Sequence, residues 1–143
     1  MKLISKFALL ITIITILYLI VSGNLFSSSP FVIGVQFLGV ALAIWARRSF
    51  QKGQFSIHAQ PEKGTLLATG PYRFIRHPMY AATLLIIWSG ILGHLSIINI
   101  VIGMIAISVA AIRIVYEEQF LQAQYPDYAE YSHKTKRIIP FVI

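Results

Sequence analysis

Ionisable and aromatic side chains gather in two short segments of this otherwise apolar sequence. The first, residues 70–80, reads GPYRFIRHPMY, and the second, residues 113–118, reads RIVYEE. Arg113 and Glu117 are four residues apart, so they share one face of a helix. A simple ion pair within that helix would explain them, but charges among long apolar segments usually face a protein interior or a cavity. The two segments therefore predict a polar binding site.

Histidines and cysteines narrow the chemistry that this site could perform. His77 precedes Pro78, and proline is favoured in the first turn of a helix, so His77 is interpreted first as a hydrogen-bonding residue at a helix start and second as a catalytic group. His58, His94 and His133 have no partners at metal-ligand spacing, and no metal site is predicted. The chain has no cysteine, which excludes disulfides, thiolate metal sites and a cysteine nucleophile.

Four apolar segments must position these residues. Hydrophobic residues make up 57% of the 143 residues and charged residues 12%, about half the roughly 25% of soluble domains. The first segment has small residues near Val21 that resemble a signal-peptide cleavage point, but its removal would leave an odd number of spans. We predict an all-α membrane protein of one domain, residues 1–143, with transmembrane helices at about 5–22, 31–47, 79–95 and 97–116.

Lysine and arginine predict how these helices are oriented. Most of them lie in the long loop 48–78 and in the tail 117–143, whereas the connections 23–30 and 93–96 contain none. The positive-inside rule then places both termini, the loop and the site in the cytoplasm, in a multi-pass integral membrane protein. Because the basic residues lie between apolar segments, they indicate contact with membrane lipids, and no nucleic acid is expected.

The third and fourth helices are predicted to form a hairpin, because only a short connection separates them. Their cytoplasmic ends would then lie side by side and bring Tyr72, His77, Tyr80, Arg113 and Glu117 into one small volume. Small residues at helical spacing would let the two backbones approach closely: Ser89, Gly93, Gly103, Ala106 and Ala110. A carboxylate pair at the end of the fourth helix would oppose the helix dipole, which argues against an idle pair. The tyrosine-rich tail is expected to form an amphipathic interfacial segment.

These motifs resemble those of a known family. Residues 70–72 (GPY), 76–80 (RHPMY) and 113–118 (RIVYEE) are similar to the paired motifs of isoprenylcysteine carboxyl methyltransferases and related phospholipid methyltransferases. The tail residues 125–131 (YPDYAEY) also resemble theirs, and the similarity covers about residues 57–143.

The resemblance implies a cofactor, S-adenosylmethionine, and a lipid-like methyl acceptor. By that resemblance Glu117 completes the cofactor site and Arg113 orients the acceptor, while Glu118 matters less because it points about 100° away. Gly64 and Ile57 stand where eukaryotic members carry a histidine and a glutamine. Nothing in the sequence indicates an obligate protein partner. The remaining cofactor-binding residues implied are Thr65, Leu66, Leu67, Tyr72, His77, Pro78, Met79 and Tyr80.

Carboxyl O-methylation of the isoprenylcysteine type is the favoured reaction. An acceptor carboxylate is already ionised and needs no base, and Arg113 can hold it bidentately. N-methylation of a lipid amine is the first alternative. Membrane sterol reductases, which use NADPH, have similar C-terminal motifs, but their usual cysteine and tryptophan are missing from this tail. A non-enzymatic membrane adaptor is disfavoured because ionisable groups concentrate at one paired helix end.

Overall fold

The computed structural model describes residues 2–50 and 66–139 of the chain. Within these two ranges the protein is all-helical, as predicted, and the only β-pairing is an isolated parallel bridge between Ile75 and Lys136. The elements are α1 (Lys2–Val21), α2 (Pro30–Arg48), the 3-10 helix η1 (Gly70–Arg73), α3 (Pro78–Gly93), α4 (Ile97–Gln124) and α5 (Tyr128–Lys134).

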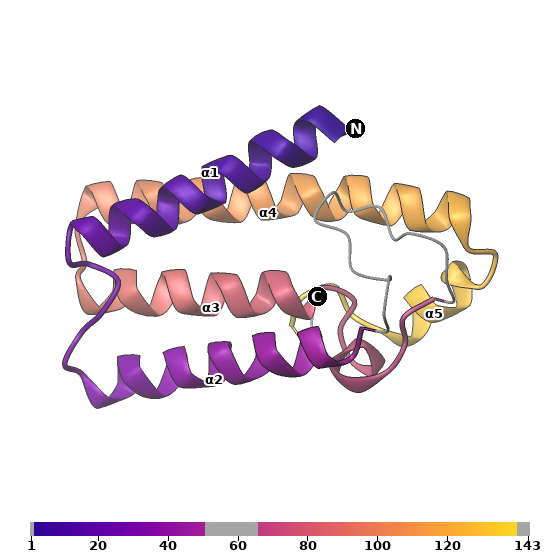
Figure 1. Cartoon of the computed structure of the whole chain (residues 1–143), viewed down its shortest axis with the longest axis horizontal. Helices are drawn as coiled ribbons and strands as arrows, with labels where there is room; N and C mark the ends of the chain where they lie inside the picture. Colours follow the sequence, from indigo (N-terminus) through magenta and orange to yellow (C-terminus); the bar gives the residue numbers. More distant parts are fainter. Residues whose placement is uncertain (1, 51–65, 140–143) are drawn as a thin grey trace.

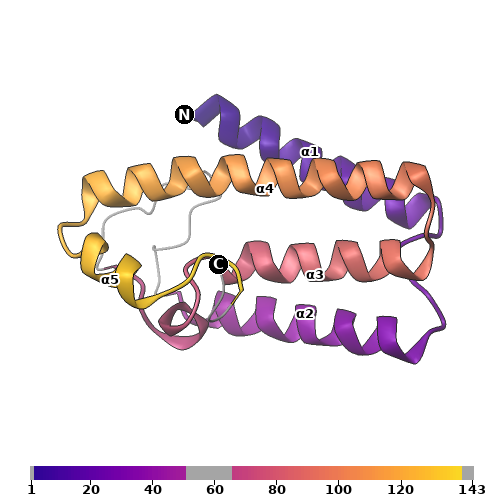
Figure 2. The same cartoon turned by 180° about the vertical axis from the view of Figure 1, so that it is seen from behind.

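The four long helices lie side by side in the order α2, α3, α4, α1 (Figure 1). The connections α1–α2 and α3–α4 lie at one end of this bundle, and η1 and α5 lie at the other, together with the start of α1 (Figures 1 and 2). The predicted hairpin of the third and fourth helices is therefore confirmed. It brings residues 70–80 and the second half of α4 to the same end of the molecule.

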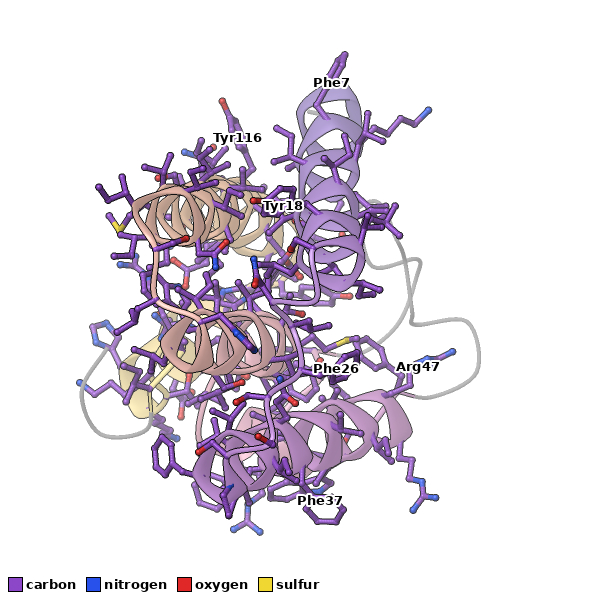
Figure 3. All side chains as sticks on the ribbon, turned by 90° about the vertical axis from the view of Figure 1, so that its left-hand side faces the viewer. Phe7, Tyr18, Phe26, Phe37, Arg47 and Tyr116 are labelled. Atoms are coloured by element: carbon purple, nitrogen blue, oxygen red, sulfur yellow. The ribbon has the colours of Figure 1, made fainter. Side chains whose placement is uncertain are left out.

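Large apolar side chains cover the outside of the bundle. Phe7 and Phe37 are 62% and 72% exposed and point away from it on opposite sides (Figure 3). Helices α2 and α4 are long and apolar enough to cross a membrane, yet only 17% and 33% of their most apolar stretches are buried inside the protein. A soluble core does not explain such surfaces. The apolar part of α1, Lys6–Val21, and α3 are shorter.

Glycines allow the helices to pack closely. A Cβ added at Gly103 of α4 would lie 2.7 Å from Ile91 Cδ1 and 2.8 Å from Trp88 Cζ2 of α3, as predicted for the hairpin. Gly39 of α2 is equally close to α3, where an added Cβ would lie 2.8 Å from Ile86 Cγ1. Gly93 is also predicted to lie between the third and fourth helices, but it packs against Ser27 of the α1–α2 connection.

A polar cluster lies at the end of the hairpin where α3 connects to α4. Asn99, only 1% exposed, accepts a hydrogen bond from Asn24 Nδ2 at 3.3 Å and donates one from Nδ2 to the His94 carbonyl at 2.6 Å. The His94 ring in turn lies 2.8 Å from the Phe26 carbonyl oxygen. These contacts join the two connections and set the register of α3 against α4.

Helix α4 is longer than predicted. Three helices begin and end within three residues of the expected bounds, but α4 continues beyond 116 to Gln124. Residues 117–124, EEQFLQAQ, are mostly good helix formers, and Pro126 follows shortly after the helix end. Glu117 and Glu118 therefore lie inside the helix, and the dipole argument against an idle pair does not apply to them.

Candidate functional site

The site is built around the first turn of α3. His77 immediately precedes α3 and is 3% exposed, and it hydrogen-bonds at the helix start, in line with its first interpretation, although its side chain does not cap the helix. Its ring lies between two carboxylates instead: Nδ1 is 3.8 Å from Glu117 Oε2, and Nε2 is 3.4 Å from Glu118 Oε1. The Tyr80 hydroxyl donates a 3.0 Å hydrogen bond to the same Glu117 Oε2.

Tyr80 joins the two charged residues of the predicted pair. Its ring faces Arg113, whose guanidinium carbon lies 5.5 Å from the ring centroid, while its hydroxyl binds Glu117. An arginine over an aromatic face is attracted by the ring quadrupole. The structure therefore places Tyr80, Arg113 and Glu117 together, with His77 beside them at 5.7 Å from the Tyr80 ring.

Glu117 and Glu118 have different environments although they are neighbours in the sequence. The Glu118 side chain is 11% exposed and pairs with Arg76 Nε at 2.9 Å and with Arg137 Nη2 at 2.9 Å. The Glu117 side chain is 24% exposed, and both contacts that it makes with the described residues are to Oε2. Glu118 is thus paired through both oxygens, whereas Oε1 of Glu117 makes no polar contact with the residues that the structure describes.

The end of α5 and the residues that follow it pack against the segment before α3. Arg76 Nη1 donates hydrogen bonds of 2.6 Å to the carbonyls of Ser132 and Thr135, at the end of α5. The tail then runs beside the segment before α3, where the backbone amides of Arg76 and His77 donate to the carbonyls of Lys136 and Arg137 at 2.7 and 2.9 Å. A cation at a helix C-terminus also complements the helix dipole.

Tyr72 lies in η1, next to this cluster. Its ring packs edge-on against Phe50 at 5.6 Å, and its carbonyl accepts a 2.7 Å hydrogen bond from the Tyr131 hydroxyl. Burial raises the pKa of Tyr72 above its usual range, and the charge of Glu117 acts in the same direction. Burial also raises the pKa of Tyr131 to about 12. Both tyrosines therefore stay protonated at neutral pH.

The other predicted residues are less central in the described structure. Pro78 and Met79 form the first turn of α3, with Pro78 buried and Met79 partly buried. Leu66 and Leu67 are partly buried in the irregular segment before η1. Thr65 lies outside the described residues, as do Ile57 and Gly64.

Sequence reasoning missed the residues that hold the tail in place. Arg76, Glu118 and Arg137 form one ion network, although none was assigned a role. A signal was available, because the chain has only five acidic residues and two of them are adjacent. A buried carboxylate needs cationic partners, and the sequence offers them at Arg76 and Arg137.

The profile of the family described as phospholipid methyltransferase matches residues 30–128, more than half of the chain. The chain belongs to this family. The resemblance seen in the sequence motifs is thereby confirmed, and the matched region contains the whole of α2, α3 and α4. The exposed apolar surfaces of α2 and α4 agree with membership of a family of membrane methyltransferases.

One curated relative is the cobalt-zinc-cadmium resistance protein CzcN of Cupriavidus metallidurans. It is 31% identical over 119 residues, which cover 78% of this chain and 50% of the relative, so the chain spans about half of its length. Among the described residues of this chain, no group of three or more histidine, aspartate or glutamate side chains is placed to hold a metal ion. No solved structure matches the chain.

Proposed function

We propose that this protein transfers a methyl group from S-adenosylmethionine to a lipid-like acceptor at the membrane surface. The observation that carries the proposal is the Glu117 carboxylate, which is partly exposed between Tyr80 and His77 and whose Oε1 makes no polar contact within residues 2–50 and 66–139. A carboxylate of this kind suits the ammonium group or the ribose hydroxyls of the cofactor. The family match makes methyl transfer the reaction class to test.

The chemistry of the side chains fits this cofactor. S-adenosylmethionine supplies an activated methyl group on a sulfonium, so the protein has to bind and align rather than to activate. The rings of Tyr72 and Tyr80 offer aromatic faces to a cation. Glu117 would hold a polar edge of the cofactor, and His77, Pro78 and Met79 would line it at the start of α3, with Leu66 and Leu67 beside it.

Arg113 is the residue proposed to orient the acceptor. It lies one helical turn from Glu117, and its guanidinium carbon lies 5.5 Å from the centroid of the Tyr80 ring, whose hydroxyl donates a hydrogen bond to Glu117. A planar guanidinium holds a carboxylate through two parallel hydrogen bonds, and an ionised carboxylate needs no base to accept a methyl group. Carboxyl O-methylation of an isoprenylcysteine-type acceptor is therefore the favoured reaction.

A lipid amine is the second candidate acceptor, because the matched family is named for phospholipid methylation. An amine must lose a proton before or during methyl transfer, so the site would need a general base. Tyr72 and Tyr131 do not fill that role near neutral pH, because burial raises the pKa of each. The two acceptors therefore predict different pH dependences.

We also propose that the bundle acts as one catalytic unit that crosses the membrane four times. Helices of 20, 19, 16 and 28 residues are about 30, 28, 24 and 42 Å long at 1.5 Å per residue, against an apolar bilayer core of about 30 Å. Arg47 and Arg48 at the end of α2, and the basic residues near η1 and α5, all lie at the site end of the bundle. The positive-inside rule then favours a site that faces the cytoplasm, with both termini on that side.

Calorimetric titration of S-adenosylmethionine into the purified protein in detergent tests the proposal. Wild type is expected to bind, and Glu117→Gln is expected to bind at least about tenfold more weakly, which is about 1.4 kcal/mol. Because the Glu117 side chain is partly exposed, the same variant should keep a wild-type melting temperature. Binding of NADPH in place of S-adenosylmethionine would instead identify a reductase.

A further inference from the structure

In the part of the chain that the structure describes, the hydroxyl of Tyr128 is buried without a hydrogen-bond partner. Tyr128 is 1% exposed and has the largest of the fully buried side chains in the described structure. Its hydroxyl oxygen makes no hydrogen bond there. An unpaired buried hydroxyl costs about 1–3 kcal/mol, and native proteins keep few such groups. A bound ligand that accepts a hydrogen bond from this hydroxyl would account for its presence in the buried interior.

Poor packing of the tail does not account for the unpaired hydroxyl. The three hydroxyl side chains that follow it in the same segment are all hydrogen-bonded: Tyr131 to the Tyr72 carbonyl at 2.7 Å, Ser132 to the Ala129 carbonyl at 2.8 Å, and Thr135 to the Tyr131 carbonyl at 2.7 Å. The Tyr128 and Tyr131 rings also pack together, with centroids 6.0 Å apart. The deficit belongs to a single atom in an otherwise satisfied segment.

Tyr128 lies beside the candidate site, because its ring packs against Tyr131, whose hydroxyl binds the carbonyl of Tyr72. Burial raises the pKa of the Tyr128 hydroxyl, and the charges of Glu118 and, less strongly, Glu117 act in the same direction, against that of Arg76. The hydroxyl therefore keeps its proton and is a neutral donor. Its available chemistry is to donate a hydrogen bond to an oxygen.

We propose that the Tyr128 hydroxyl contacts the cofactor and donates a hydrogen bond to one of its oxygens. This inference rests on the proposed function, because S-adenosylmethionine is the ligand expected at Glu117. The cofactor carries two kinds of suitable oxygen, in its ribose hydroxyls and in its amino-acid carboxylate. Tyr128 would extend the binding surface from α3 and α4 to the tail helix α5.

The test compares three tyrosine-to-phenylalanine variants, each of which removes one hydroxyl. Tyr128→Phe should leave the melting temperature of the ligand-free protein unchanged or raised, because the lost hydroxyl has no partner to lose. Its affinity for S-adenosylhomocysteine, measured by calorimetry, should fall about threefold to tenfold. Tyr131→Phe breaks a 2.7 Å hydrogen bond and should lower the melting temperature by about 2–4 °C. Tyr116→Phe, on an outward-facing ring (Figure 3), should change neither quantity.

A shorter ligand separates the two kinds of oxygen. Methylthioadenosine keeps the ribose and lacks the amino-acid carboxylate, so weaker binding of both ligands to Tyr128→Phe assigns the ribose, and weaker binding of S-adenosylhomocysteine alone assigns the carboxylate. Wild-type affinity of Tyr128→Phe for S-adenosylhomocysteine would overturn the inference and leave the proposed function intact. A melting temperature that falls as far as that of Tyr131→Phe would also overturn it, because the hydroxyl would then have a partner in the ligand-free protein. A wild-type protein that binds neither ligand would overturn both proposals.

Discussion

Glu118→Gln is expected to destabilise the protein more than any other single removal of charge at this site. The substitution keeps the size of the side chain but removes the negative charge that Arg76, Arg137 and His77 share. Arg76 is the partner that decides the cost, because its side chain is only 10% exposed. When a buried cation loses its carboxylate partner, the free-energy cost of removing the cation from water is no longer offset by the ion pair.

The size of the effect follows from the burial of each partner. Removing one member of a buried pair costs about 3–5 kcal/mol, but Arg76 keeps two carbonyl partners at Ser132 and Thr135, so about 2–3 kcal/mol is expected for this pair. The Arg137 side chain is 53% exposed, and such a pair is worth about 0–1 kcal/mol. The sum, about 2–4 kcal/mol, corresponds to a fall of about 4–16 °C in melting temperature.

Thermal unfolding of the purified protein in detergent, followed by far-UV circular dichroism, measures this fall. Arg137→Ala is the matched control, since it removes only the exposed partner and should lower the melting temperature by less than about 4 °C. Well below the transition, Glu118→Gln should bind S-adenosylmethionine more tightly than Glu117→Gln does. A Glu118→Gln protein that melts like wild type and loses the cofactor would refute the division of roles between the two glutamates.

Two further predictions concern the acceptor and the approach to α3. Arg113→Lys should lose most of its activity on a carboxylate acceptor, with little change in cofactor affinity. Wild-type turnover of that acceptor should be flat from about pH 6 to about pH 9. Turnover of phosphatidylethanolamine that rises with pH would indicate an amine acceptor instead. Gly70→Ala should destabilise the protein by about 2–4 kcal/mol in thermal unfolding, because Gly70 has φ +59° and an added Cβ would overlap Ser49 Oγ. Gly34→Ala, at a helical glycine with no atom within 4 Å of the added Cβ, should be neutral or stabilising by comparison.

The helical architecture was predictable because apolar segment length and the distribution of charge are local properties of the sequence. Four apolar segments, a short connection and Pro78 were enough to predict the hairpin and the start of α3, and the structure confirms both. Family membership could be recognised for the same reason, because its motifs lie at the ends of that hairpin. The roles assigned to Arg113 and Glu117 stay predictions.

The contacts of the tail could not be predicted, since they join residues far apart in the chain. No periodicity indicates that the amide of His77 donates to the carbonyl of Arg137, or that Arg76 binds the last carbonyls of α5. The end of α4 was placed too early because the apolar pattern fades after Tyr116 while helix propensity continues. A transmembrane pattern predicts where a helix is apolar, and it says little about where the helix ends.

The adjacent glutamates show how one helix serves structure and ligand at once. Successive residues on a helix point about 100° apart, so Glu117 and Glu118 cannot both face the same partner. Because Arg76 and Arg137 hold Glu118 toward the tail, Glu117 is directed toward Tyr80 on the neighbouring helix. His77 lies within 4 Å of both carboxylates, so any shift of the tail that moved Glu118 would also move the ring beside Glu117. The tail is therefore part of the site's architecture, although its residues come last in the described chain.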